Sequence, residues 1–320
     1  MNDRMAPGES AMEARSPARR RIAIIFNPAA GRRRRRRLEQ VLKHLRRADL
    51  EIVLHATRVR GDAERFARDI AIADSPDDRF DMLVAAGGDG TIGEVVNGLM
   101  SVPDAARRPP LALVPLGTAN VLATEIGLGK SPRAATAAIS GGIPRPIYIG
   151  TVCGRCFTMM VGAGFDAQAV ATVDLDLKRR IGWVAYVVAT AKVALRYGSP
   201  RYRVEADGQA YEAASVIVSK GRYYGGPFLL APDARLDQPE FHVCLFERDG
   251  TWHSIRYGLA LLLGILPRLS GYRIVTGRSI LVDGPAGAPL QGDGDLIGTV
   301  PARIELSATT LTLMLPPAVA

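Results

Sequence analysis

Side chains that bind zinc or form disulfides are scarce in this sequence, which holds three cysteines and four histidines in 320 residues. Cys153 and Cys156, with only Cys244 elsewhere, cannot build a disulfide framework or supply the ligands of a structural zinc site. The histidines show no metal-ligand spacing. Cys153-Gly154-Arg155-Cys156 is predicted to be a hairpin whose turn, Gly154-Arg155, sets the two cysteines opposite each other. The shortage favours a reducing compartment.

Long apolar runs are also missing. The two most apolar windows, residues 181–195 and 257–266, are shorter than the roughly 18 residues that a spanning helix needs. The second window is predicted to be core or the lining of a lipid acyl pocket. Residues 178–186 are typical of an interfacial helix or of a helix packed on a sheet. Residues 1–20 lack the apolar run of a secretory signal, so a soluble, cytoplasmic chain with a disordered tail is expected.

Charge of one sign is confined to one end of the chain. Residues 1–47 hold 14 basic and 4 acidic side chains, whereas the remaining 273 residues hold 27 basic and 28 acidic ones. The net charge of +9 therefore comes from a cationic N-terminal segment that includes six consecutive arginines, residues 32–37. A binder of nucleic acid is not expected, because basic charge is not distributed over the chain and no aromatic residues interleave the arginines.

The pattern of apolar segments predicts two domains. Short apolar strands alternate with amphipathic helices over residues 21–143, which is typical of a three-layer α/β domain with a parallel sheet. Residues 144–320 contain many short β-rich segments, which predict a mostly antiparallel β-sandwich interrupted by helices near residues 181–195 and 254–266. The return of the last strand, residues 310–315, to the first domain is left open.

The most informative segment is a glycine-rich turn between a buried strand and a helix. Residues 81–86 are apolar, and the turn reads Gly87-Gly88-Asp89-Gly90-Thr91. Glycines let a ligand approach the backbone closely, and the N–H groups that open a helix favour an anion. The spacing fits neither the dinucleotide fingerprint nor the Walker loop. An aspartate inside a phosphate-binding loop indicates a divalent cation nearby.

Further glycine-rich and polar motifs follow in order along the chain. They are Asn27-Pro28-Ala29-Ala30-Gly31, Pro115-Leu116-Gly117-Thr118-Ala119-Asn120, Gly162-Ala163-Gly164-Phe165-Asp166-Ala167, Gly225-Gly226, Ala231-Pro232-Asp233-Ala234 and Gln291-Gly292-Asp293-Gly294-Asp295. With the glycine-rich turn, this series resembles the diacylglycerol kinase catalytic family, which includes bacterial lipid kinases and sphingosine kinases and is related to NAD kinases. The resemblance implies an α/β nucleotide domain and a β-sandwich with the active site in the cleft between them.

The resemblance also implies roles for individual residues. Those expected to bind ATP are Asn27, Arg32, Thr57, Gly87, Gly88, Asp89, Gly90, Thr91, Gly117, Thr118 and Asn120. Asp89 would hold Mg²⁺ or the γ-phosphate, and Arg32 would lie near the phosphates. The general base is expected in Asp293-Gly294-Asp295, so Asp89, Asp293 and Asp295 are the catalytic candidates. A carboxylate of ordinary pKa suffices, because the hydroxyl loses its proton late in phosphoryl transfer.

The sequence departs from the family pattern at four places. Asp295 stands where glutamate is usual, which shortens the side chain by about 1.5 Å. Val121 and Gly93 stand where aspartate and asparagine are common. In the family's structural metal loop, Asp-Asp-Gly or Asn-Asp-Gly is common. This sequence has Asp237-Gln238-Pro239, which lacks the second carboxylate and leaves Asp237 as the candidate ligand of a second metal.

The function that the resemblance implies is an ATP- and Mg²⁺-dependent lipid kinase, which phosphorylates a hydroxyl of a membrane lipid such as diacylglycerol. Its expected partner is the membrane lipid, reached by peripheral contact at the inner face of the membrane, and a homodimer is left open. NAD kinase is the alternative enzyme, disfavoured by Gly-Thr-Ala-Asn and the Asp-Gly-Asp step. An alternative of another class is a nucleotide- or lipid-binding regulatory protein whose kinase activity has decayed.

Overall fold

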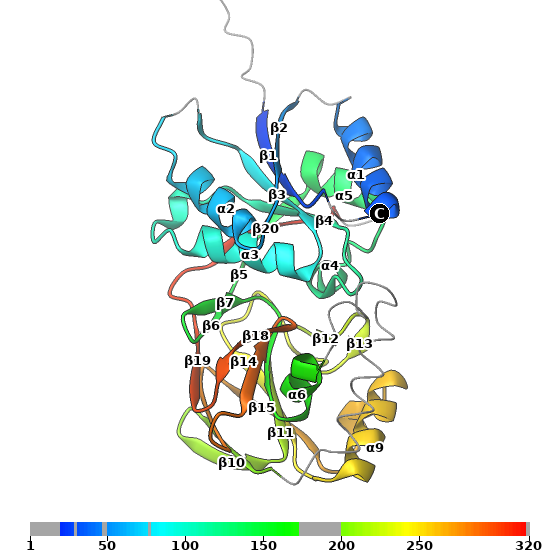
Figure 1. Cartoon of the computed structure of the whole chain (residues 1–320), viewed down its shortest axis with the longest axis vertical. Helices are drawn as coiled ribbons and strands as arrows, with labels where there is room; N and C mark the ends of the chain where they lie inside the picture. The colour runs from blue at the N-terminus through cyan, green and yellow to red at the C-terminus, as the bar shows by residue number, and fades with distance from the viewer. Residues whose placement is uncertain (1–19, 29–30, 47–49, 76–77, 173–199, 318–320) are drawn as a thin grey trace, which may run out of the picture.

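A computed structural model describes residues 20–28, 31–46, 50–75, 78–172 and 200–317. Figure 1 shows two domains stacked along the long axis of the molecule. The tail expected before Arg20, the helix expected over residues 181–195 and the segment 178–186 lie outside these ranges. In the described part of the chain, none of the helices has the length and apolar character to cross a membrane.

A six-stranded sheet forms the centre of the first domain. Its order is β2-β1-β3-β4-β20-β5, and the first four strands run parallel. The bounds are β1 Arg20–Phe26, β2 Leu50–Ala56, β3 Met82–Gly87, β4 Leu111–Pro115, β5 Ile143–Ile147 and β20 Leu311–Leu315. Strands β3 and β4 are buried along their whole length, as expected of parallel strands that are covered on both faces.

Helices cover both faces of this sheet. Helices α1 (Gly31–Leu45) and α5 (Pro132–Gly141) pack on one face, and α2 (Asp62–Ile72) and α3 (Asp89–Met100) pack on the other. Alternate residues of β1 point to opposite cores, because successive side chains of a strand face opposite ways. Ile22 and Ile24 belong to the core under α1 and α5, and Ala23 and Ile25 to the core under α2 and α3.

The second domain is a sandwich of two antiparallel sheets. Their orders are β10-β9-β16-β19-β6-β7 and β15-β14-β11-β8-β17-β18, and their inner faces share one apolar core. The strands are β6 Gly150–Val152, β7 Arg155–Phe157, β8 Met160–Ala163, β9 Tyr202–Ala206, β10 Gln209–Ala213, β11 Ser215–Ser219, β14 Phe241–Phe246, β15 Tyr272–Gly277, β16 Ser279–Asp283, β17 Pro289–Gly292, β18 Asp295–Thr299 and β19 Ala302–Leu306. The fold class expected from the sequence is confirmed.

Short elements complete the description. Among the described residues, the remaining α-helices are α4 (Val121–Glu125), α6 (Phe165–Thr172) and α9 (Thr251–Leu262), and a small hairpin pairs β12 (Tyr223–Tyr224) with β13 (Phe228–Leu229). In the same ranges, 3₁₀ turns cover Ala105–Arg107 and Leu266–Arg268.

The chain passes between the domains differently from the expected pattern. The sequence predicts one strand over residues 145–153, but the structure has β5 in the first sheet and β6 in the second. Strand β5 carries Pro144 and Pro146 and lies at the sheet edge, where a missing N–H costs no ladder bond. It pairs antiparallel with β20, the last strand, which lies beside β4. Strand β20 therefore ties the last part of the described chain to the first domain.

The hairpin at the two cysteines is shifted by one residue. Val152 lies opposite Arg155, and Thr151 lies opposite Cys156, so the turn is Cys153-Gly154. Both turn residues have positive φ, 50° for Cys153 and 72° for Gly154, as this two-residue turn requires. The prediction of the turn at Gly154-Arg155 was therefore wrong, and the cysteines are not opposite each other.

Candidate active site

The glycine-rich turn joins the buried strand β3 to helix α3. Gly87 ends β3, Gly88 is the N-cap residue and Asp89 begins the helix. A Cβ at Gly87 would lie 2.4 Å from the Cβ of Thr91. At Gly88 a Cβ would lie 3.0 Å from the Cα of Gly117. Glycine fits both positions because the turn folds back on its own helix at Gly87 and lies tightly against the loop after β4 at Gly88.

Asp89 joins this turn to the loop after β4. Its Oδ2 accepts a hydrogen bond from the N–H of Asn120 (2.9 Å), and its Oδ1 accepts one from Val121 (2.8 Å). The carboxylate thus caps the first N–H groups of α4. The expected role of Asp89 in holding Mg²⁺ or the γ-phosphate stays a prediction, and the structure adds this structural role.

The loop after β4 is closed by the side chain of Asn120. Its Oδ1 accepts from the N–H of Gly117 (2.7 Å), and its Nδ2 donates to the Gly117 carbonyl (2.8 Å). Asn120 is buried and has a left-handed backbone with φ of 51°, a conformation that asparagine tolerates better than most residues. Both loops are therefore held in fixed positions at the carboxyl ends of β3 and β4.

Basic side chains surround Thr118. Arg34 Nη2 lies 3.4 Å from the Thr118 hydroxyl, and Lys130 Nζ donates to the Thr118 carbonyl at 3.1 Å. Arg37 donates to the Pro115 carbonyl at 3.2 Å. Arg32, expected to contact phosphate, lies in the first turn of α1, and its side chain falls outside the described structure. Within the arginine run the sequence reasoning named Arg32 as the phosphate contact, and it named neither Arg34 nor Lys130.

Asp295 faces the glycine-rich turn from the second domain. It begins β18, and its Oδ2 lies 4.0 Å from the position that a Cβ at Gly90 would occupy. Arg60, between β2 and α2, holds this carboxylate with an Nη2–Oδ2 distance of 3.0 Å. Thr57 lies three residues before Arg60 and is buried. Its hydroxyl donates to the carbonyl of Phe26 at 3.3 Å, and Phe26 directly precedes Asn27. The structure therefore brings the predicted elements together, and adds Arg60, which no motif marked.

Asp293 anchors the same loop instead of facing solvent. Its carboxylate accepts hydrogen bonds from the Thr158 N–H (2.6 Å) and hydroxyl (2.9 Å), and from the N–H groups of Met159 and Met160 (both 2.9 Å). Burial raises the pKa of Asp293, but these four donors favour its ionised form. This geometry suits a positioning role two residues from Asp295, and the predicted catalytic role of Asp293 remains untested.

A second buried carboxylate supports the loop from the other side. Asp166 accepts hydrogen bonds from the Tyr224 hydroxyl and from Gln291 Nε2, and Gln291 Oε1 accepts from the Gly294 N–H at 2.8 Å. Burial raises the pKa of Asp166. A Cβ at Gly162 would lie 2.1 Å from Asp166 Oδ2, which explains the glycine in that motif.

Polar contacts fix the two domains against each other. Arg222 lies in the loop before β12, and its side-chain Nε donates to Glu125 Oε1 of the first domain at 2.9 Å. The backbone N–H of Arg222 donates to Glu125 Oε2 at 2.8 Å. Asn97 of α3 exchanges two hydrogen bonds with the backbone of Cys156, at 2.9 and 3.0 Å. These contacts hold Asp295 and the glycine-rich turn in one arrangement.

The predicted second metal does not fit the residues around Asp237. Lys220 is fully buried, and its Nζ donates to the carbonyls of Arg235 (3.0 Å), Gln238 (2.5 Å) and Glu240 (3.0 Å). Burial lowers the pKa of Lys220 to about 8, so the ammonium predominates at neutral pH. Arg235 binds both oxygens of Asp237 at 2.9 Å and lowers its pKa. Two protein cations thus occupy the oxygens that a metal would need.

Elsewhere in the described ranges, no three His, Cys, Asp or Glu side chains gather to hold a metal ion.

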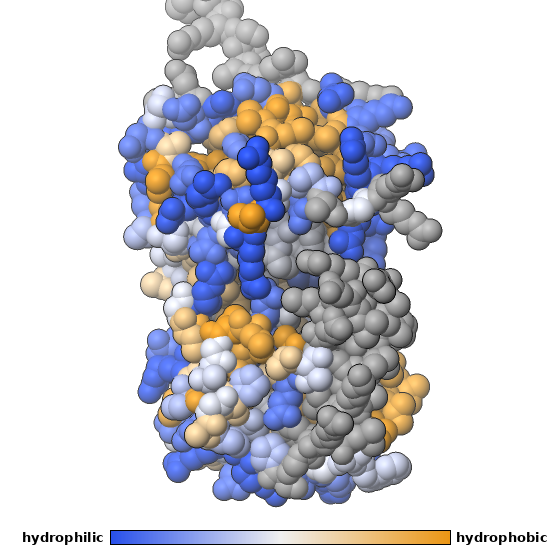
Figure 2. All heavy atoms as spheres, in the orientation of Figure 1, coloured by the Kyte–Doolittle hydropathy of each residue, from blue (hydrophilic) through white to orange (hydrophobic). Residues whose placement is uncertain are grey.

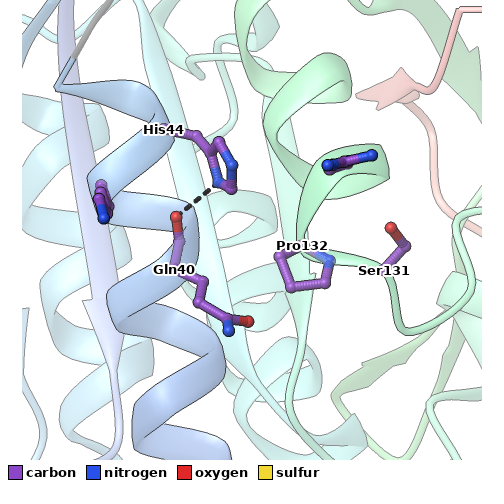
Figure 3. Close-up of a pocket in the computed structure, with 6 residues that line it drawn as sticks. Gln40, His44, Ser131 and Pro132 are labelled. Carbon is purple, nitrogen blue, oxygen red and sulfur yellow. Dashed lines mark hydrogen bonds between the residues drawn. The ribbon is translucent and has the colours of Figure 1, made fainter.

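A separate open pocket lies between α1 and α5 (Figure 3). Its lining includes Lys43, His44 and Arg133, and His44 Nδ1 lies 2.7 Å from the Gln40 carbonyl. The pocket contains none of the predicted site residues.

A glycine-rich turn opening a helix and a carboxylate from a second domain are the parts of a phosphoryl-transfer enzyme. The family model of the diacylglycerol kinase catalytic domain matches residues 21–152, and that of the YegS C-terminal NAD kinase beta sandwich-like domain matches residues 159–315. The chain belongs to the diacylglycerol kinase family, as its motifs indicated.

Relatives agree with this assignment, and a solved structure shares the fold. A diacylglycerol kinase of Bacillus subtilis is 33% identical over 250 residues, 77% of this chain and 80% of the relative. A diacylglycerol kinase of Staphylococcus saprophyticus is 30% identical over 72% of this chain and 74% of the relative. The fold is that of a diacylglycerol kinase crystal structure from Bacillus anthracis, with a TM-score of 0.76, 24% identity and coverage of 95% and 100%.

Replacing Gly88 with alanine should push the two loops apart, because the new Cβ meets the backbone of Gly117. We expect phosphoryl transfer to fall by about tenfold or more, since small misplacements of reacting groups are costly. The matched control is Gly93→Ala in the same helix, where a Cβ meets nothing within 4 Å. It should keep activity and raise the free energy of unfolding by about 0.5–1 kcal/mol. Equal activities of the two variants would contradict the loop contact.

Replacing Lys220 with methionine should leave three buried carbonyls without their donor. We expect the free energy of unfolding, measured in urea, to fall by about 3 kcal/mol. Lys43→Met, at an exposed lysine of α1, should change it by less than about 0.5 kcal/mol. A Lys220 variant as stable as the control would show that the ammonium does not hold the 235–240 loop.

Proposed function

We propose that the protein is an ATP- and Mg²⁺-dependent lipid kinase that transfers the γ-phosphate to a hydroxyl of a diacylglycerol-like membrane lipid, at the inner face of the membrane. The observation that carries the proposal is the position of Asp295. Its carboxylate belongs to the sandwich domain, yet it lies against Gly90 of the glycine-rich turn and is held by Arg60 of the first domain. The curated relatives named diacylglycerol kinase support the choice of lipid.

The first turn of α3 supplies the phosphate-binding part of the proposal. The N–H groups and the dipole at a helix start favour an anion, and Gly87 and Gly88 keep side chains out of its way. Arg34 and Lys130 at Thr118 add positive charge close to this turn. Such preorganised charge stabilises the anionic transition state without reorganisation.

Asp89 would hold the Mg²⁺ ion together with the phosphates of ATP, because carboxylate and phosphate oxygens are the ligands that this cation prefers. The ion would supply charge neutralisation to the anionic transition state.

Asp295 acts as the general base in the proposed reaction. The lipid hydroxyl oxygen forms a bond to the γ-phosphorus as the bond between that phosphorus and the β-γ bridging oxygen breaks. The hydroxyl proton passes to the Asp295 carboxylate, and ADP leaves with the electron pair of the broken bond. Arg60 positions the carboxylate, and Asp293 fixes the loop that carries it.

Transfer of label from γ-labelled ATP tests this function. The purified chain is incubated with Mg²⁺ and, in separate arms, with diacylglycerol, phosphatidylglycerol, a sphingoid base or NAD, and each product is identified by mass. We expect label in the diacylglycerol product. Label in NAD alone would make the protein an NAD kinase. Binding of ATP without transfer to any acceptor, with Mg²⁺ or Mn²⁺, would favour a regulatory protein.

A further inference from the structure

Helix α9 presents an apolar stripe to solvent. Trp252, Ile255, Leu259 and Leu262 follow one another at intervals of three, four and three residues, which places them on one helical face. Trp252 is 71% exposed and Leu259 is 54% exposed. Leu263 and Ile265 extend the patch beyond the helix, and these six residues are more than half of the eleven exposed large hydrophobic residues in the described chain.

The opposite face of α9 already anchors the helix to the sandwich. Tyr257 and Ala260 are buried, and the Tyr257 hydroxyl donates to the Gly271 carbonyl at 2.6 Å. The ring of Tyr257 packs against Phe246 at a centroid distance of 5.1 Å. The exposed stripe is therefore additional to the contacts that hold the helix in place.

The exposed side of α9 forms a shallow apolar groove at the edge of the molecule, where Figure 2 shows hydrophobic residues at the lower right. The groove is lined by Trp252, Ile255, Leu259 and Leu263 together with Arg256. A tryptophan beside leucines and an arginine is typical of a helix that lies in a membrane interface.

The charged side chain that lines the groove is positive. Residues 250–282 contain no acidic residue and four arginines, one of which, Arg273, pairs with Glu247. Arg256 lines the groove and Arg268 is exposed just beyond it. The acidic residues before the helix are already paired: Glu247 lies 2.9 Å from Arg273, and Asp249 lies 3.6 Å from Arg201. The surface is therefore complementary to an anionic layer with an apolar interior.

We propose that the exposed face of α9, with the turn that follows it, inserts into the surface of a bilayer containing anionic lipid and docks the enzyme there. The choice of a bilayer as occupant rests on the proposed lipid-kinase function, since a membrane lipid is then the substrate. Apolar side chains enter the acyl boundary, and Arg256 and Arg268 contact the anionic headgroups.

Vesicle binding of the full chain tests this surface without requiring catalysis. Vesicles of mixed phosphatidylglycerol and phosphatidylcholine are compared with vesicles of phosphatidylcholine alone in a flotation assay. The variant Leu259→Ser/Leu263→Ser should bind the anionic vesicles about tenfold more weakly or worse. The control Leu54→Ser/Ile72→Ser changes residues that are 46% and 47% exposed elsewhere, and should bind within about twofold of the wild type. Equal loss in both double variants would overturn the proposal.

A kinase assay separates docking from chemistry. On a water-soluble short-chain diacylglycerol, the Leu259→Ser/Leu263→Ser variant should turn over like the wild type, whereas on vesicles it should lose activity. Turnover retained on vesicles would overturn the proposal. If the wild type transfers no phosphate but still needs α9 to bind vesicles, the proposed function fails and the docking surface stands.

Tryptophan fluorescence and light scattering supply independent readouts. The chain has two tryptophans, so Trp183→Phe leaves Trp252 as the single reporter, whose emission should shift to the blue on anionic vesicles. An unshifted emission would contradict insertion. A dimeric wild type that becomes monomeric in Leu259→Ser/Leu263→Ser, with vesicle binding unchanged, would assign the stripe to an interface between two copies and overturn the membrane proposal.

Discussion

The arrangement of the site depends on the carboxylate of Asp89. It accepts the N–H groups of Asn120 and Val121, which ties the turn after β3 to the loop after β4. Gly88 and Gly117 meet at the backbone, so no side chain separates the two loops. One acidic residue therefore stabilises the shape of the two loops and also adds negative charge there. Arg34 and Lys130 bring positive charge to Thr118, in the loop that this carboxylate caps.

The sandwich domain completes the site through a chain of buried hydrogen bonds. Asp293 is held by backbone groups of residues 158–160, and Asp166 holds Gln291, which in turn bonds Gly294. Asp295 thus begins β18 on a loop that is fixed from both sides. Unpaired buried carboxylates would be costly, so these networks keep the loop in one conformation. The apolar stripe on α9 belongs to the same domain as Asp295.

The alternation of apolar strands with amphipathic helices was sufficient to predict the α/β domain, because parallel strands read as continuous apolar runs. The series of short β-rich segments after residue 143 was sufficient to predict the sandwich. Long-range pairing was not visible: β5 joins the first sheet only because β20 returns there from the chain end. Motif spacing located Asp89, Asn120 and Asp295. Arg60 and Lys220 escaped notice, since a lone arginine or lysine carries no pattern and its partner lies far away in sequence. The apolar run at α9 did not reveal which face would be exposed.

In the proposed reaction, Asp295 takes the proton of the attacking lipid hydroxyl. The most direct test of this role is the turnover of Asp295→Asn, which keeps the shape of the side chain but removes the basic oxygen. We expect kcat to fall by about a hundredfold or more while the KM for ATP changes little. Asp69→Asn, at an exposed aspartate of α2, serves as the control and should leave kcat unchanged. A turnover in Asp295→Asn equal to that of the control would exclude Asp295 as the general base.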